Sequence, residues 1–197
     1  MILDRIFFER PTVKIAKSLL GKYLCRRYPS ANSGRGRGKV IRAMITEVEA
    51  YDGFKDKASH AHRGMTPRNK IMFGSAGCWY VYFTYGMHWM LNIVIGKKGY
   101  PAAILIRGVQ SMEVKPPYSG AIINYSACNI NGPGRVTKFF KIGKQFHEKL
   151  ANCKTGLWIE GNPKFRNLKS KIRNSPRVGV DYAGPIWSKK KYRLYLV

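Results

Sequence analysis

The chain has 197 residues, and its 36 lysines and arginines outnumber its 10 aspartates and glutamates, so its formal net charge is +26 at pH 7. The length suits one domain with a substantial core, and a hydrophobic content of 45% excludes an intrinsically disordered chain. Such an excess of positive charge is typical of proteins that bind the phosphate backbone of nucleic acids. No apolar run reaches the ~20 residues of a membrane span, and the N-terminal run is too short for a secretory signal. We therefore expect an intracellular protein away from membranes, in the cytoplasm or nucleoid of a bacterium or the nucleus of a eukaryote.

The first part of the chain predicts a helix followed by two strands. In Arg10–Gly21, proline stands near the start, glycine follows the end, and apolar residues recur at helical spacing. Strands are predicted at Lys22–Tyr28 and Val40–Tyr51, separated by a flexible basic loop, Pro29–Lys39. We expect the two strands to form a hairpin.

The second of these strands opens an acidic cluster. Four of the ten carboxylates lie between Glu47 and Asp56 in an otherwise strongly basic chain. A carboxylate beside a basic surface repels a nucleic-acid partner, so acids gathered in one place indicate chemistry rather than solubility. Because side chains alternate between the faces of a strand, we expect Glu47 and Glu49 to lie side by side. Ile45 and Tyr51 are predicted on that same face.

A short helix is predicted after the acidic cluster. Thr66 suits an N-cap, Pro67 suits the first helical position, and Gly74 marks the end. The N-terminus of a helix presents free backbone N–H groups and a partial positive charge. We therefore predict a phosphate-binding position at Thr66 and Arg68.

An aromatic block predicts a second hairpin. Strands are predicted at Trp79–Phe83 and Met87–Ile95, with Thr84–Gly86 as the tight turn between them. The tyrosine at the centre of this turn, Tyr85, is exposed unless another surface covers it. The hairpin tip is therefore a candidate binding surface.

The rest of the chain completes a mainly β pattern. We predict a buried strand at Pro101–Gln110, a loop at Glu113–Asn131, a helix at Gly132–Ile142, a short strand at Leu157–Glu160, and one or two closing strands between Arg177 and Tyr195. The four cysteines show neither a C-x-x-C pair nor a spacing suited to a metal, so we expect reduced thiols. No interdomain linker is evident, and one domain is expected over residues 1–197.

Short motifs along nearly the whole chain carry a family resemblance. They are Leu19-Leu20-Gly21-Lys22, Glu49-Ala50-Tyr51, Thr66-Pro67-Arg68-Asn69, Tyr80-Val81-Tyr82, Tyr85-Gly86-Met87, Leu105-Ile106-Arg107 and Arg177-Val178-Gly179-Val180. With these motifs the chain resembles the alkyladenine (3-methyladenine) DNA glycosylase family of the antiparallel-sheet type. The resemblance implies an α+β fold with a curved, mainly antiparallel sheet, surrounding helices and a protruding β-hairpin. The chain departs from the family pattern at Gly108-Val109-Gln110, where an acidic, proline-containing segment is usual, and in Glu113–Asn131.

The resemblance assigns the chemistry to three residues. Glu49 would be the general base that activates a water molecule against the anomeric carbon of the sugar. Arg107 and the backbone carbonyl of Val178 would hold that water, although Arg107 could instead form a plain salt bridge with Glu49. Whether Glu47 assists Glu49 stays open. An alkylated purine is already a cationic leaving group, so a general acid is less necessary.

Base binding and base flipping are implied by the same resemblance. The flipped base would lie in an aromatic pocket made by Tyr51, His60 and Tyr82, because electron-rich rings hold a cationic purine well. Asn92 would lie at the pocket floor and reject the exocyclic amine of guanine. Tyr85, with Met87 beside it, would enter the minor groove and fill the gap left by the flipped nucleotide.

The implied activity is that of a monofunctional DNA glycosylase in base excision repair. It would act as a monomer on double-stranded DNA and excise alkylated or deaminated purines of the 3-methyladenine, 7-methylguanine and hypoxanthine type, without a cofactor or metal. The matched motifs place no lysine at the pocket, so no lyase step is expected. Composition leaves two alternatives. One is a non-catalytic basic RNA-binding or ribosome-binding protein, and the other is a metal-dependent nuclease using Glu47, Glu49, Asp52 and Asp56.

Overall fold

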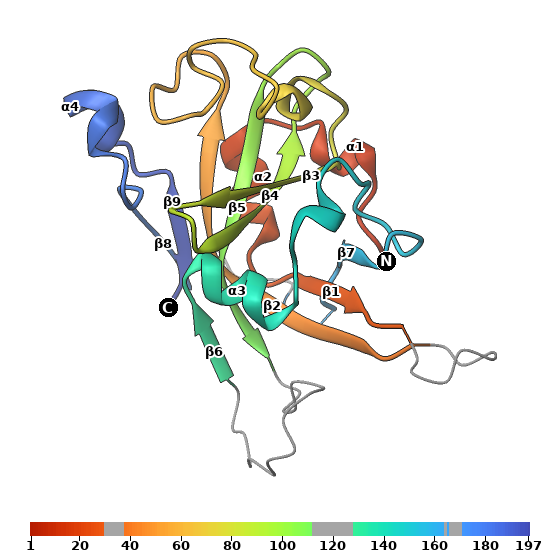
Figure 1. Ribbon diagram of the computed structural model, residues 1–197. Helices are drawn as coiled ribbons and strands as arrows, with labels where there is room; N and C mark the ends of the chain where they lie inside the picture. Colours follow the sequence, from red (N-terminus) through yellow and green to blue (C-terminus); the bar gives the residue numbers. More distant parts are fainter. Residues whose placement is uncertain (30–37, 112–127, 164, 166–170) are drawn as a thin grey trace.

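A curled antiparallel sheet dominates the computed structural model, which describes residues 1–29, 38–111, 128–163, 165 and 171–197 (Figure 1). The strands are β1 (Tyr23–Arg27), β2 (Val40–Asp52), β3 (Trp79–Thr84), β4 (His88–Ile95), β5 (Ala102–Ser111), β6 (Cys128–Asn131), β7 (Leu157–Glu160), β8 (Ile172–Ser175) and β9 (Arg193–Leu196). The main path runs β3-β4-β5-β2-β1-β7, with β6 beside β5, β9 beside β2 and β8 beside β9. Every pairing among these described strands is antiparallel. The predicted α+β fold with a curved sheet is confirmed.

Short helices surround the sheet. They are α1 (Arg5–Phe8), α2 (Thr12–Leu19), α3 (Pro133–Phe139) and α4 (Gly184–Ser188), together with the 3-10 helices η1 (Lys70–Phe73), η2 (Lys144–Phe146) and η4 (Asp181–Ala183). The first predicted helix is α2, which buries Ile15, Ala16 and Leu19 in the core. Within the described ranges, no helix has the length and apolar character needed to cross a bilayer.

The two faces of the central strands have different surroundings. Val48, Ile104 and Ile106 are buried in the main core, which also contains the inner residues of α2. The opposite face carries a smaller cluster that includes Tyr80 and Ala103. The second face therefore combines aromatic and apolar side chains.

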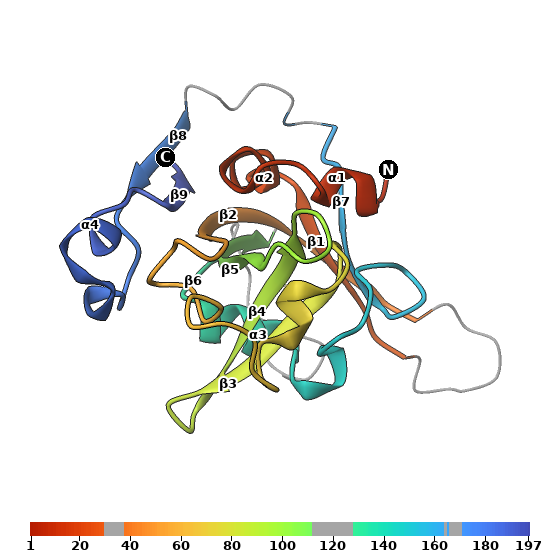
Figure 2. The same cartoon turned by 90° about the horizontal axis from the view of Figure 1, so that it is seen from above.

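Both predicted hairpins are present. In the first, Tyr23 of β1 lies opposite Met44 of β2. In the second, Trp79 lies opposite Ile93, and Thr84 lies opposite His88 next to the turn. The β3–β4 hairpin projects from the body of the protein in the view from above (Figure 2). Most of the predicted basic loop, residues 30–37, lies outside the described ranges.

The centre of β2 departs from a regular pleat. The β2–β5 ladder skips Thr46 and Arg107, so each strand contains one extra residue at this point. The extra residue reverses the alternation, and Ile45 is buried in the main core instead of sharing a face with Glu49. The prediction for Ile45 was therefore wrong, whereas Glu47 and Glu49 do lie together, because both contact Arg107.

The helix predicted from Pro67 starts later and is a 3-10 helix. The Thr66 N–H donates to Asn69 Oδ1 at 2.7 Å, and the Asn69 N–H donates to Thr66 Oγ1 at 3.3 Å. These reciprocal bonds close a turn before η1 begins at Lys70, and Gly74 ends η1 as predicted. Pro67 consequently lies in a turn and not at a helix N-terminus.

Further corrections concern the C-terminal half of the chain and helix α1. Part of the predicted loop Glu113–Asn131 is strand β6, which pairs with β5, while residues 113–127 lie outside the described ranges. Helix α3 ends before Ile142, because Lys141 adopts a positive φ of 49°. The closing strands are β8 and β9, whereas Arg177–Val180 forms a turn, and helices α1 and α4 were not predicted.

Candidate active site

The strand register brings the predicted site residues to one face of the sheet. Residues opposite each other in an antiparallel pair point to the same side. Leu105 lies opposite Glu49 on β2 and opposite Asn92 on β4, and Asn92 in turn lies opposite Tyr80 on β3. With alternation along each strand, this face carries Glu49, Tyr51, Tyr80, Tyr82 and Asn92 beside Ala103 and Leu105.

Glu49 is a fully buried carboxylate with a donor at each oxygen. The Tyr51 hydroxyl donates to Oε2 at 2.9 Å, and the Val178 N–H donates to Oε1 at 2.8 Å. Arg107 Nη1 lies 3.5 Å from Oε1. Burial is the largest influence and raises the pKa of Glu49, while these three donors oppose it. A buried carboxylate with a raised pKa holds a proton more strongly than a solvated one, which suits a group that accepts a proton from water.

A second acid fixes the position of Arg107. Glu47 Oε1 accepts hydrogen bonds from Arg107 Nε at 3.0 Å and from Arg193 Nε at 2.5 Å. The salt bridge considered from the sequence is present but shared, because Arg107 reaches Glu47 through Nε and Glu49 through Nη1. The two acids therefore have different surroundings. Glu47 accepts hydrogen bonds from two arginines, and Glu49 is buried on the face that also carries Tyr51 and Asn92.

A buried ion pair that the sequence analysis did not identify supports the turn at Val178. Arg177 donates to both carboxylate oxygens of Asp56, at 2.5 and 2.8 Å, and both residues are buried. The same guanidinium donates to the Ala50 carbonyl at 2.8 Å, next to Glu49 in β2. Arg177 thus ties the turn that supplies the Val178 N–H to the strand that supplies Glu49. The resemblance implies a role for the Val178 carbonyl, and that role stays a prediction.

Three rings form an aromatic cluster on the same face. The ring centroids of His60 and Tyr82 are 4.8 Å apart, and those of Tyr80 and Tyr82 are 5.1 Å apart. His60 Nδ1 lies 2.9 Å from the Tyr80 hydroxyl oxygen. Burial, with a smaller contribution from Arg68, lowers the pKa of His60 to about 4, so its ring is neutral at pH 7. Tyr51, the third ring predicted for the pocket, lies beside the buried carboxylate.

Asn92 is buried opposite Tyr80, and its Nδ2 donates to the Tyr80 carbonyl at 3.1 Å. This is the backbone hydrogen bond that an asparagine in a strand commonly makes, and it fixes the orientation of the amide. The role of Asn92 against guanine stays a prediction. Tyr80 was not predicted as a site residue, although its alternation with Tyr82 along β3 was a signal that could have found it.

The β3–β4 hairpin ends in a strained and exposed turn. Tyr85 and Gly86 have φ values of 52° and 64°, the pattern of a type I′ turn. The Met87 N–H donates to the Thr84 carbonyl at 3.1 Å. The side chain of Tyr85 is 80% exposed and that of Met87 is 68% exposed. A tyrosine at positive φ costs about 1 kcal/mol or more, so the turn presents this ring against the local backbone preference. The exposed tip is confirmed, and its insertion into DNA stays a prediction.

The two residues predicted to bind phosphate lie in different settings. Thr66 is exposed and bonds Asn69, and no helix begins beside it. Arg68 lies with its guanidinium carbon 4.8 Å from the centroid of the Tyr82 ring and donates to the Phe83 carbonyl at 3.4 Å. Arg68 therefore belongs to the edge of the aromatic cluster, and phosphate binding by either residue stays a prediction.

The carboxylates that a metal-dependent nuclease would need already accept hydrogen bonds from other side chains. Glu47 and Asp56 each accept from guanidinium groups, and Asp52 accepts from the hydroxyl groups of Thr12 and Tyr100. Among the residues that the structure describes, no group of three or more His, Cys, Asp or Glu side chains could hold a metal ion. The donor set does not fit a divalent cation.

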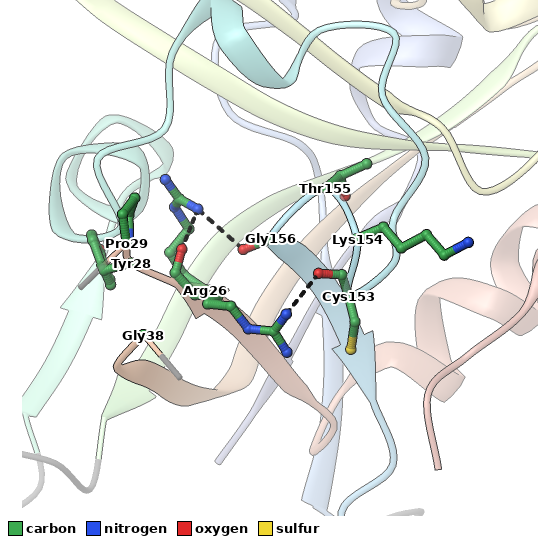
Figure 3. Close-up of a pocket in the computed structure, with 9 residues that line it drawn as sticks. Arg26, Tyr28, Pro29, Gly38, Cys153, Lys154, Thr155 and Gly156 are labelled. Carbon is green, nitrogen blue, oxygen red and sulfur yellow. Dashed lines mark hydrogen bonds between the residues drawn. The ribbon is translucent and has the colours of Figure 1, made fainter. Parts of the chain in front are cut away.

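A hollow of about 290 Å³ lies elsewhere, where the end of β1 meets the turn before β7 (Figure 3). Arg26 donates there to the carbonyls of Arg27, at 2.5 Å, and Gly156, at 3.2 Å, and Arg27 donates to the Cys153 carbonyl at 3.2 Å. These arginines stabilise the surrounding backbone. None of the predicted site residues lines the hollow.

Comparison with known proteins identifies the family. The family model described as methylpurine-DNA glycosylase (MPG) matches residues 6–197. A protein of Methanocella arvoryzae is 40% identical over 185 residues, which cover 93% of this chain and 86% of that protein. A protein of Myxococcus xanthus is 37% identical over 194 residues, covering 98% of this chain and 89% of its own length. A protein of Psychrobacter cryohalolentis is 36% identical over 189 residues, covering 90% and 84%. All three bear the provisional name 3-methyladenine DNA glycosylase. The chain therefore belongs to the methylpurine-DNA glycosylase family.

Proposed function

We propose that residues 1–197 form one DNA glycosylase domain, acting as an intracellular monomer in base excision repair. It hydrolyses the N-glycosidic bond of alkylated and deaminated purines in double-stranded DNA. Family membership supports the reaction class. The observation that carries the mechanism is the buried carboxylate of Glu49, which accepts hydrogen bonds from Tyr51 and from the Val178 N–H.

In the proposed reaction, a water molecule between Glu49 and the sugar attacks C1′. Glu49 accepts one proton from this water as the new C1′–O bond forms, and the electron pair of the N-glycosidic bond leaves with the base. Arg107, which lies 3.5 Å from Glu49 and is held by Glu47, orients the carboxylate and the water, with the Val178 carbonyl as the second partner of the water. The products are a free base and an abasic site. A cationic base such as 3-methyladenine becomes neutral as it leaves, so it needs no general acid. A neutral base such as hypoxanthine takes up one proton from solvent as it leaves.

The aromatic cluster suits a cationic purine. A protonated imidazole would repel such a base, but the low pKa of His60 keeps its ring neutral. The neutral rings of His60 and Tyr82 offer electron-rich faces, and Tyr51 borders the carboxylate end of the pocket. Asn92, held by its bond to the Tyr80 carbonyl, is assigned the rejection of the guanine amine.

Two further parts of the proposal concern the DNA. Tyr85 fills the gap left by the flipped nucleotide, with Met87 beside it in the minor groove, since both side chains project from a fixed turn. Thr66 and Arg68 are assigned phosphate contacts beside the pocket, and their exposure permits this.

The proposal includes hydrolysis without strand cleavage. A lyase step needs an amine nucleophile that forms a Schiff base with the sugar. Among the described residues, the cationic side chains that contact Glu49 or the Tyr51 ring are Arg107 and Arg177. A guanidinium stays protonated and does not serve as such a nucleophile. The expected product is therefore an intact strand with an abasic site.

Single-lesion duplexes test this function. Native protein is incubated with duplexes containing hypoxanthine or 7-methylguanine, and half of each sample is treated with alkali before a denaturing gel. We expect cleavage only after alkali, no cleavage of undamaged duplex, and full activity in chelator. Cleavage without alkali would indicate a lyase or nuclease, and loss of activity in chelator would favour the nuclease. Binding of RNA or DNA without any base release would favour the basic binding protein.

A further inference from the structure

The segment Val178–Lys191, named here the C-terminal arm, displays large apolar side chains to solvent. Val178 is 51% exposed, Tyr182 is 71% exposed and Ile186 is 70% exposed. The arm contains η4 and α4, and it projects from the sheet in both views (Figures 1 and 2). An anchored projection that exposes three large apolar side chains is a candidate binding surface.

The arm is held in place by specific contacts. Ala183 packs with Ala58 in a small buried cluster. The Tyr182 hydroxyl donates to the Ala58 carbonyl at 3.0 Å, and Arg177 Nη2 donates to the Trp187 carbonyl at 3.3 Å. The apolar side chains are thus presented on an anchored surface.

The arm begins at the buried carboxylate and runs outward from it. Its first residue, Val178, donates its N–H to Glu49. Burial raises the pKa of Tyr182, Arg177 lowers it, and three further groups raise it, namely Asp56, Tyr85 and Glu49. The phenol is therefore within electrostatic range of both the buried acid and the hairpin tip. Figure 2 shows α4 and the β3–β4 hairpin as two projections on one side of the molecule, with the chain that follows β2 between them.

Charge points to DNA as the partner of this surface. The arm ends in Lys189–Lys191, and its one acid is Asp181. A nucleotide that reaches Glu49 has a phosphate on either side, so the damaged strand must pass the mouth of the site. Lysines neutralise phosphates, while sugars offer an apolar surface to neighbouring side chains.

We propose that Tyr182 and Ile186 contact the damaged strand beside the extruded nucleotide, across the site from Tyr85, so that two projections hold the duplex. This inference rests on the proposed function, because it requires a nucleotide at Glu49. Among the described residues of the arm, the direct hydrogen bond to the carboxylate comes from the Val178 N–H. The exposed side chain of Ile186 should therefore contribute to DNA affinity and not to the chemical step.

A pair of aspartate variants tests the arm. Ile186→Asp places a negative charge on it, and Ile6→Asp is the matched control, because Ile6 is 76% exposed on α1, on the other side of the molecule (Figure 2). Affinity for a duplex with a stable abasic-site analogue is measured by fluorescence anisotropy at fixed salt. We expect Ile186→Asp to weaken binding at least about 10-fold and Ile6→Asp less than about 2-fold, because a like charge beside phosphates is unfavourable.

Excision at saturating protein and thermal unfolding complete the test. If the native protein excises the damaged base, and Ile186→Asp and Ile6→Asp bind the duplex with equal affinity, the inference is overturned and the proposed function stands. Native protein that releases no damaged base would overturn both. A loss confined to the saturated excision rate would also overturn the inference, since it would place Ile186 in the chemical step. If Ile186→Asp unfolds, Ile186→Ala replaces it. We expect Ile186→Ala to lower the affinity for the duplex about 3-fold, the scale of one contact of this size. Native affinity in Ile186→Ala would contradict the role of the arm in DNA binding.

Discussion

Glu49 must be ionised to accept a proton, and burial raises the pKa at which it ionises. The excision rate should therefore fall as the pH falls through this raised pKa, giving an acidic limb above about 4.3, the ordinary value for glutamate. Single-turnover excision of 7-methylguanine is the suitable measurement, because this leaving group is cationic without being protonated. An acidic limb at or below the ordinary glutamate value would contradict the effect of burial.

The same raised pKa has the opposite consequence for stability. An acid whose pKa is higher in the folded state contributes stability below its unfolded pKa, and this is lost as pH rises through the folded pKa. Above its raised folded-state pKa, the ionised Glu49 therefore disfavours folding, and the neutral variant Glu49→Gln should keep or raise the melting temperature measured there. Glu47→Gln should lower it, since Glu47 bonds two arginines. A fall of more than about 3 °C in Glu49→Gln, roughly 1 kcal/mol at this chain length, would disagree with this reasoning.

The β3–β4 hairpin presents its ring on a turn whose backbone favours other residues. Asparagine adopts positive φ more easily than tyrosine, so Tyr85→Asn should raise the melting temperature slightly. The same variant should slow excision about 10-fold in a well-paired duplex and less opposite a mismatch, because extrusion is harder from paired DNA. Tyr85→Phe keeps the ring and is the control. If Tyr85→Asn reduced the excision rate by the same factor in both duplexes, Tyr85 would not be the residue that fills the gap left by the flipped nucleotide.

The Arg177–Asp56 pair positions the turn that supplies the Val178 N–H. Asp56→Asn leaves a buried guanidinium without its charge partner, which should cost about 3–5 kcal/mol in the free energy of unfolding. The matched control is Glu9→Gln, which breaks the exposed Arg5–Glu9 pair and should cost no more than about 0.5 kcal/mol. Urea unfolding measures both. Equal costs would show that burial adds nothing to the Arg177–Asp56 pair.

The spacing of apolar residues along the chain predicted most of the helices and strands. It did not predict the irregularity in β2, which depends on how β2 pairs with β5. The strands, the first helix and the exposed hairpin tip each follow from a local pattern. The irregularity in β2 does not, because it depends on the ladder with β5, where Thr46 and Arg107 are unpaired. Gly108 lies opposite Glu47 there, and an added Cβ would approach the Glu47 Cβ to 3.0 Å. The glycine that departs from the family pattern thus fits the close approach of these strands.

The site was predicted to a similar extent. Glu49, Arg107 and Val178 were predicted from their motifs, and the structure brings them together, while their catalytic roles stay predictions. The partnership of Arg177 with Asp56 was missed, since these residues are 121 positions apart and nothing local links them. The Arg-Val-Gly-Val motif places Arg177 directly before Val178, but it does not indicate that Asp56 is the partner of Arg177.

At the scale of the whole molecule, the net charge of +26 predicts how binding depends on salt. A duplex-spanning basic surface that makes ~5 phosphate contacts should give a slope of about −4 to −5 for log affinity against log salt concentration. Anisotropy titrations of an undamaged duplex across a salt series measure this slope. A flat response would show that backbone contacts are not the main source of affinity.

Glu49→Gln separates DNA binding from base excision more directly than any other change in the molecule. The glutamine keeps the shape of the side chain, so affinity for a lesion duplex should stay within about 2-fold of native, while single-turnover excision should fall at least ~10²-fold, the scale of a lost general base. Glu47→Gln is the matched control and should lose much less. Excision by Glu49→Gln at more than half of the native rate, with affinity unchanged, would contradict the assignment of Glu49 as the base.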